Sequence, residues 1–183
     1  MPISCQPIEI SGRNWISRRA AAEAIRNDPE WNSGNYEKNP SYYIWTAAAN
    51  SLRTESATRI QELAPTRATA DALYEARLSQ AARGDANDAL WAIEAIMDYN
   101  PEPDLDKITA KVLLINAEED EANPPELGTV ERAMKRVRHG RHVLIPASDK
   151  THGHFTHFYA EVWKPYLIEL MKTLGAPLQA AAE

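Results

Sequence analysis

The hydrophobic pattern divides the chain into a helical first part and a second part in which strands and helices alternate. Segments rich in Ala and Arg predict helices over 15–27, 41–63, 66–83 and 85–97. Pro29 ends the first helix, and the Gly, Asn and Pro residues of 32–41 predict turns. Thr66 and Asp85 precede the last two helices and are their expected N-caps.

Buried strands and helices alternate after residue 99. Short runs of Val, Ile and Leu predict strands buried on both faces over 111–117 and 142–146. A helix is expected between them at 125–137, with Leu127, Val130, Met134 and Val137 as its apolar positions. A closing helix over 156–174 is expected to bend or restart at Pro165 and to end at Gly175. The opening segment "MPISCQPIEI" predicts a strand fragment.

The order of strand, helix, strand and helix predicts an α/β fold with parallel strands and crossover helices. Ligands of such sheets bind beyond the carboxyl ends of the strands. The acidic segment 118–125 follows the first predicted strand, and the segment 148–157 follows the second. We therefore expect both loops at one edge of the sheet.

The second of these loops contains His152, His154 and His157, three of the five histidines of the chain. They could be metal ligands, one catalytic base with two bystanders, or polar loop residues. A histidine that acts as a general base needs a carboxylate to orient it, and the acidic loop supplies candidates. The same acidic residues could instead form only a solvated turn.

The spacing H-x-H-x-x-H also resembles that of dinuclear metallo-β-lactamase-like hydrolases, which makes a metal site the rival interpretation. Such a site needs a carboxylate beside the last histidine, where this chain has Thr156. It also needs later ligands, but no His, Cys or Asp follows His157. An open three-histidine zinc site remains as the alternative.

The acidic loop "VLLINAEEDEANPPE" resembles that of α/β-hydrolases, in which the triad acid comes before the histidine. On this pattern the acid is Asp120, with Pro124 after it. "GHFTHFYAEVWKPYLIELM" resembles the histidine loop and last helix of the homoserine O-acetyltransferase-like branch, which makes His154 the base. "AEAIRNDPEWNSGNY" resembles the entry to its helical lid. The resemblance implies three parts: a partial strand with its lead-in (1–14), a lid (15–98) and a core segment (99–183).

The nucleophile of this family stands in a G-x-S-x-G elbow, and no two of the seven glycines are four positions apart. In the family the elbow precedes the strand that "MPISCQPI" resembles. We therefore expect only the C-terminal half of the fold, inactive alone, with an N-terminal half on another chain. Alternatively, the chain is a non-catalytic remnant or interaction module.

The resemblance also bears on the substrate. Homoserine-specific members carry polar contacts at positions that correspond to Trp45, Leu52 and Phe155. Because all three are apolar here, we expect an apolar small-molecule ester or acyl acceptor. The resemblance implies no cofactor and no metal.

Composition narrows the range of partners. The sequence is 44% hydrophobic and 25% charged, which is typical of a globular domain. Its net charge of -6 predicts no nucleic-acid or membrane partner. The single cysteine, Cys5, fits a reducing cytoplasm.

Overall fold

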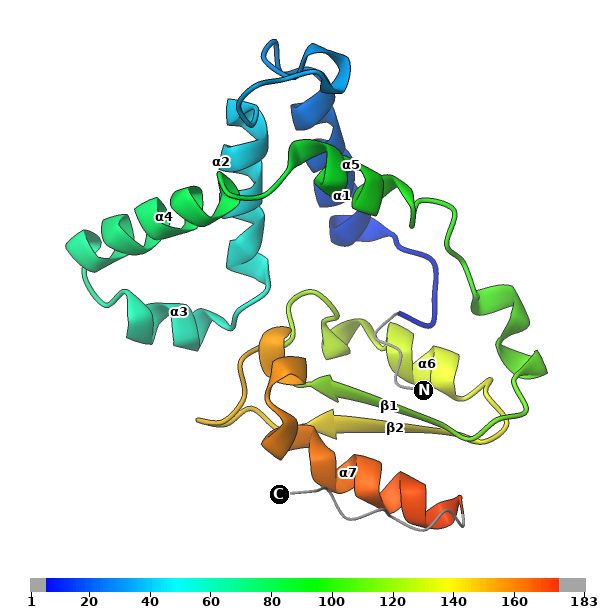
Figure 1. Ribbon diagram of the computed structural model, residues 1–183. Coiled ribbons are helices and arrows are strands. Elements are labelled where there is room, and N and C mark those ends of the chain that lie inside the picture. The colour runs from blue at the N-terminus through cyan, green and yellow to red at the C-terminus, as the bar shows by residue number, and fades with distance from the viewer. Residues whose placement is uncertain (1–5, 175–183) are drawn as a thin grey trace, which may run out of the picture.

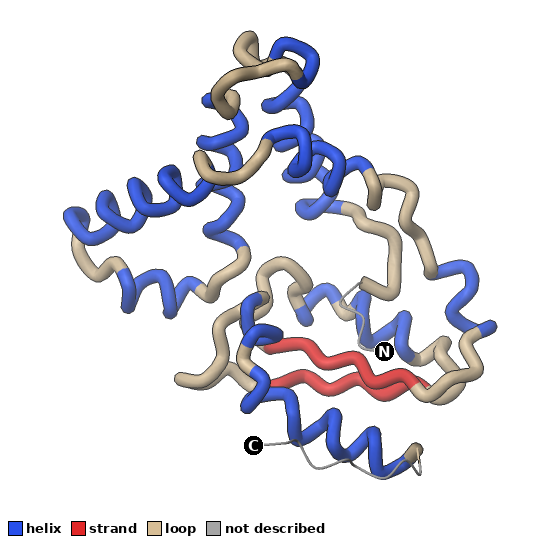
Figure 2. Tube along the Cα trace, viewed as in Figure 1, coloured by secondary structure: helices blue, strands red, loops and turns tan. Residues whose placement is uncertain are grey.

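The computed structural model describes residues 6–174, and its helical lid stands over a small α/β core (Figure 1). Every strand residue belongs to the core, whereas the lid consists of helices and loops (Figure 2). None of the helices in this range is long and apolar enough to cross a membrane.

Five α-helices form the lid: α1 (Gly12–Arg26), α2 (Ser41–Asn50), α3 (Ala57–Leu63), α4 (Arg67–Ala81) and α5 (Ala86–Glu94). Helices α1 and α5 bury a small apolar cluster of Ala22, Ile25, Ala86 and Leu90. Both predicted N-caps are confirmed. The Thr66 hydroxyl accepts a hydrogen bond from the Thr69 amide, and the Asp85 carboxylate accepts bonds from two amides of α5.

The single helix predicted over 41–63 is wrong. The segment divides into α2, the 3₁₀ helix η2 (Ser51–Arg53) and α3. The Ser51 hydroxyl donates to the carbonyl of Ala48 at 2.6 Å, and the Ser56 hydroxyl accepts from the Arg59 amide at 3.2 Å. These side chains bond to the backbone in place of the helical ladder and end one helix before the next begins.

The core contains β1 (Val112–Ala117) and β2 (Gly140–Ile145), which pair in parallel as predicted. Helix α6 (Thr129–Met134) connects them, and α7 (Ala160–Thr173) follows β2, so that the two helices lie on opposite sides of the strands (Figure 1). Val130, Met134 and Val137 are buried as expected, in a cluster with Leu105 and Ala133. The first four residues of β1 are only half-buried, and each strand of the described two-stranded sheet has one unpaired edge.

The two helices of the core also differ in extent from the prediction. Gly128 adopts a left-handed conformation (φ 62°), so the helix expected over 125–137 shrinks to α6 after the 3₁₀ helix η4 (Pro125–Leu127), and Leu127 is exposed. The 3₁₀ helix η5 (Phe155–Phe158) precedes α7, which continues through Pro165 without restarting. Gly175 lies outside the described residues.

The predicted opening strand is wrong for residues 6–10, which belong to no strand, while residues 1–5 lie outside the described range. Pro7 has no amide to donate to a ladder. The Gln6 amide contacts the side chain of Asn123 instead, and Ile8 packs against the core cluster below α6.

Candidate functional site

The acid loop (residues 118–125) and the histidine loop (residues 146–154) emerge at the same end of the parallel strands, and three carboxylates join them. Glu118 accepts a hydrogen bond from the amide of Ala147 at 3.0 Å. Glu119 accepts one from the amide of Gly153, also at 3.0 Å. The Asp120 carboxylate lies 3.0 Å from Nδ1 of His154. The acidic residues are therefore more than a solvated turn, because they hold the histidine loop in place.

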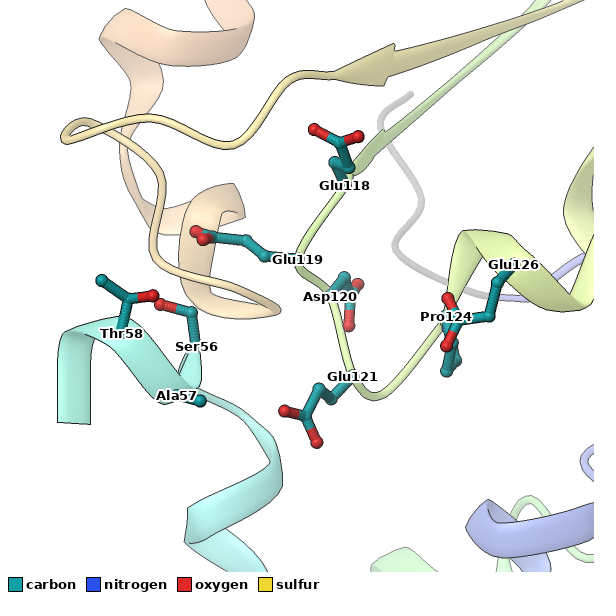
Figure 3. Close-up of a pocket in the computed structure, with 9 residues that line it drawn as sticks. All are labelled: Ser56, Ala57, Thr58, Glu118, Glu119, Asp120, Glu121, Pro124 and Glu126. Carbon is teal, nitrogen blue, oxygen red and sulfur yellow. The ribbon is translucent and has the colours of Figure 1, made fainter. Parts of the chain in front are cut away.

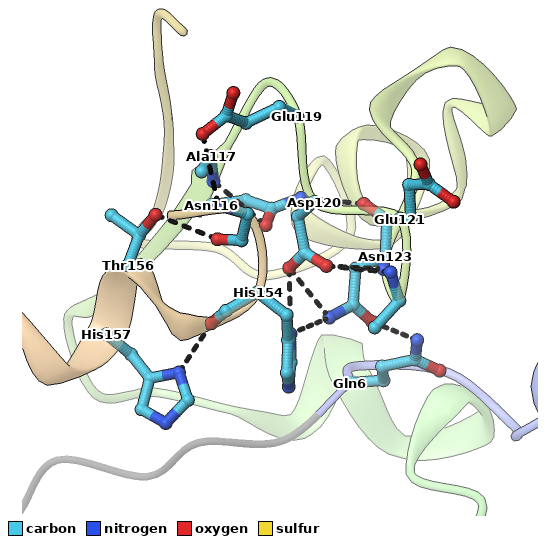
Figure 4. A network of polar contacts seen from close by, with 12 residues as sticks. Gln6, Asn116, Ala117, Glu119, Asp120, Glu121, Asn123, His154, Thr156 and His157 are labelled. Atoms are coloured by element: carbon cyan, nitrogen blue, oxygen red, sulfur yellow. Dashed lines mark hydrogen bonds and ion pairs between the residues drawn. The ribbon is translucent and has the colours of Figure 1, made fainter. Parts of the chain in front are cut away.

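Asp120 is buried, with 5% of its surface exposed, and both of its carboxylate oxygens are saturated with donors (Figure 4). Oδ1 accepts from the amides of Ala122 and Asn123 at 2.8 and 3.0 Å. Oδ2 accepts from the Asn123 side-chain amide at 3.2 Å as well as from His154. Burial alone would raise the pKa of Asp120, but His154 and Asn123 outweigh it, so the pKa lies below its ordinary value.

The carboxylate determines the tautomer of His154. An ionised carboxylate only accepts hydrogen bonds, so Nδ1 of His154 must carry the proton that it donates to Asp120. Nε2 is then the free basic nitrogen, on the edge of the ring that points away from the acid loop (Figure 4). This arrangement can accept a proton from a nucleophile and stabilise the imidazolium that results.

Asn123 orients the pair, and the sequence interpretation missed it. Its side-chain nitrogen lies 3.4 Å from Nδ1 of His154 and donates to Asp120. The backbone carbonyl of Asn123 accepts a hydrogen bond from the side-chain amide of Asn116 at 2.8 Å. The signal available in the sequence was the spacing Asp-x-x-Asn, in which an Asp side chain accepts the amides two and three residues later.

The other two loop histidines have separate roles. The ring of His152 stacks on Tyr159 with centroids 3.7 Å apart. His157 donates from Nδ1 to the carbonyl of His154 at 2.6 Å. Among residues 6–174, no group of three or more His, Cys, Asp or Glu side chains could hold a metal ion. The described geometry therefore gives the rival metal interpretation no support.

A cavity of about 210 Å³ opens between the lid and the acid loop (Figure 3). Ser56, Ala57 and Thr58 line it from the lid, and the four acidic residues of 118–121 line it from the core. The predicted substrate positions do not line this cavity. Trp45 stacks on Tyr42 and is 54% exposed, Leu52 is 53% exposed, and Phe155 packs against Phe158. Their contact with a substrate stays a prediction.

Gly153 is the point at which the histidine loop meets the lid. It has a left-handed backbone (φ +58°), and a Cβ atom placed on it would lie 2.7 Å from the backbone nitrogen of Ser56. Only glycine combines this conformation with so close an approach. The glycine beside His154 therefore sets the distance between the lid and the base.

No protein-family model and no curated protein sequence matches this chain. Solved structures do match. Homoserine O-acetyltransferase from Bacillus anthracis superposes with a TM-score of 0.70 over 90% of this chain and 50% of that protein, at 17% identity. The acetyl esterase MekB gives a TM-score of 0.69 over 92% and 52%, at 16% identity. An esterase from Exiguobacterium antarcticum gives 0.56 over 91% and 53%, at 14% identity.

The chain has the fold of the C-terminal half of α/β-hydrolases. It spans about half the length of these solved structures, which include esterases and an acyltransferase. At these identities the likeness establishes the fold alone. The lid, the parallel strands and the two loops of this chain are thus parts of an α/β-hydrolase architecture.

Proposed function

We propose that this chain supplies the acid and the base of an α/β-hydrolase-type acyltransferase or esterase, of the homoserine O-acetyltransferase-like branch. Asp120 orients His154, and His154 takes the proton of a serine that lies outside this chain. The observation that carries the proposal is the 3.0 Å contact between Asp120 and Nδ1 of His154 at the carboxyl end of two parallel strands. The partner that completes the site is a polypeptide with the nucleophile elbow and the oxyanion donors.

The similarity to a homoserine O-acetyltransferase and to esterases supports acyl transfer or ester hydrolysis as the reaction class. In the second candidate function, the chain is a non-catalytic interaction module with the same surface. The large apolar side chains that the lid exposes, including Trp45 and Trp91, favour this alternative. The two differ in whether His154 takes part in chemistry.

Reconstitution tests the proposal. The gene neighbourhood is searched for a reading frame with G-x-S-x-G, and its product is purified and mixed with this chain. The mixture should hydrolyse p-nitrophenyl acetate and react with a fluorophosphonate probe, whereas this chain alone should do neither. Replacing His154 with Gln should lower kcat of the mixture by a factor on the order of 10⁶, as for a triad histidine.

His139→Gln is the matched control, because His139 is exposed at the opposite end of β2 from the acid loop. It should leave turnover unchanged. Association of the two polypeptides without turnover would favour the interaction module. Labelling of this chain by the probe would place the nucleophile here and contradict the proposal.

A further inference from the structure

Three arginines gather where the lid faces the acid loop. Arg13 and Arg18 lie on α1, and Arg53 lies in η2. The N-terminal end of α1 and the C-terminal end of α2, which precedes η2, both face the core (Figure 1). Like charges are thus concentrated on one side of the lid, although the net charge of the chain is -6.

Two of these arginines lack partners for buried donors. Nε of Arg18 and Nη1 of Arg53 are buried without a hydrogen-bond partner among the described residues. Within residues 6–174 the Arg18 side chain forms no hydrogen bond or ion pair, and that of Arg53 donates only from Nη2, to Ser17 at 2.6 Å. Buried donors are nearly always paired, so these groups need an acceptor from elsewhere.

The electrostatics around the two arginines point to a negative acceptor. Burial lowers the pKa of both side chains. A second cation lies near each of them and lowers the pKa further: Arg53 near Arg18, and Arg13 near Arg53. The one acidic side chain that acts on Arg53 is Glu121, and it pairs with Arg13 at 3.7 Å. A guanidinium stays protonated at neutral pH, so the positive charge persists without a matching carboxylate.

Arg77 is a largely buried arginine of the same lid whose charge and donors do have partners. Its guanidinium pairs with Glu55 and also donates to the Ser51 hydroxyl at 2.7 Å. Glu55 and Ser51 flank Arg53 in sequence, yet neither forms a bond with it. The lack of a partner is therefore specific to Arg18 and Arg53 and is not general to the lid.

We propose that Arg18 and Arg53 form an anion-binding site on the lid, which takes a carboxylate or phosphate group of the substrate. The position fits, since Arg53 lies one residue before the Thr54–Ser56 segment that packs on Gly153, next to His154. Arg13 contacts Glu121, which follows Asp120. The assignment of the anion to a substrate rests on the proposed function, but the binding of an anion does not.

This site changes the expected substrate class. Two guanidinium groups offer paired donors that match the oxygen atoms of a carboxylate or a phosphate. The substrate is then an ester or acyl donor with an anionic group. Trp45 and Leu52 do not bind that group, and any contact they make is with another part of the substrate. A carboxylate would come from an acyl acceptor, and a phosphate from a phosphate-bearing acyl donor.

Binding to the whole chain tests the site without any turnover. Inorganic phosphate and monomethyl succinate are titrated by calorimetry at constant ionic strength, with neutral dimethyl succinate as the uncharged probe. We expect saturable 1:1 binding of at least one anion and none of the diester. Arg18→Gln and Arg53→Gln should each weaken binding about tenfold or more, the loss expected for one charge-assisted hydrogen bond. Tighter phosphate binding points to the donor, and tighter monoester binding to the acceptor.

Arg19→Gln is the matched control, because Arg19 adjoins Arg18 on α1 but is exposed and paired with Glu23. It should bind anions like the unchanged chain. In anion-free buffer, Arg18→Gln should keep or raise Tm, since it removes a repulsive charge that has no partner to lose; a purely structural arginine would lower it. If Arg53→Gln fails to fold, Arg53→Lys keeps the charge and should still bind more weakly. No saturable binding, or equal binding by the Arg18→Gln and Arg19→Gln variants, would overturn the proposal.

Discussion

At the scale of single residues, the candidate site depends on how one buried carboxylate is satisfied. Asp120 accepts two backbone amides through Oδ1 and two side-chain donors through Oδ2. A buried charge is stable only when it is paired and fully bonded. The bonds that keep Asp120 ionised are the same bonds that orient His154, so stability and chemistry are coupled in this residue.

Replacing Asp120 with Asn should lower the free energy of unfolding at pH 7 by about 1–3 kcal/mol, because the buried donors lose a charged acceptor. The folded-state pKa of Asp120 is depressed, so its contribution is present above the ordinary value of 3.8 and is lost as the pH falls below it. The difference between the two proteins should therefore shrink below about pH 3.8. Urea unfolding measured between pH 7 and pH 3 checks both expectations.

Glu126→Gln serves as the control, since Glu126 lines the cavity beside Asp120 and its side chain forms no hydrogen bond within residues 6–174. It should change the stability little at any pH. A loss in Asp120→Asn that stays constant from pH 7 to pH 3 would contradict the link between the carboxylate charge and folding.

At the scale of secondary-structure elements, the sequence predicts the two paired strands and the capped starts of α4 and α5 better than the breaks within helices. Thr66 and Asp85 cap their helices as expected, because an N-cap hydrogen bond joins a side chain to amides only two or three residues later in the sequence. The break at Ser51–Ser56 does not follow from the helical composition of 41–63, because it depends on Ser side chains that compete with the helix for backbone groups.

The contact between Asp120 and His154 was predictable from loop order, because parallel strands bring successive loops to one edge. The unpartnered donors of Arg18 and Arg53 could not be predicted from the sequence, because they depend on how α1 packs beside η2. Burial of a side chain by a distant element leaves no pattern in the local sequence.

Gly153→Ala should separate the lid from the histidine loop. The left-handed conformation alone costs an L residue about 1–2 kcal/mol, and the new Cβ would also meet the backbone of Ser56. Gly12→Ala isolates the first contribution, since Gly12 has φ +55° with nothing within 4 Å of an added Cβ. We expect Gly153→Ala to destabilise the chain more than Gly12→Ala in urea unfolding, and hydrogen exchange at the Ser56 amide to speed up only in Gly153→Ala. Equal effects of the two would show that the lid contact contributes nothing.

At the scale of the whole molecule, the described sheet has two strands, and β1 pairs on one side only. The Val112 amide donates to the carbonyl of His139, just before β2, and the Glu118 amide donates to that of Ile145, the last residue of β2. In a parallel ladder the alternate residues, here Leu113 and Ile115, direct their amides to the other side. In the described range no strand pairs with that side of β1. It therefore presents a strand edge that favours pairing with another strand.

The unpaired edge of β1 allows a test, independent of catalysis, of the proposal that a second polypeptide completes the fold. In this chain alone, hydrogen exchange should be fast at the amides of Leu113 and Ile115 and slow at Leu114 and Asn116, which face β2. Mixing with the polypeptide that carries the nucleophile should slow exchange at Leu113 and Ile115, because a strand of the partner then accepts their hydrogen bonds. Exchange at Leu114 should change less, which makes it the internal control within one spectrum. Slow exchange at all four amides before mixing would mean that the edge of β1 is already covered, and the partner would then have to contact the chain through the lid.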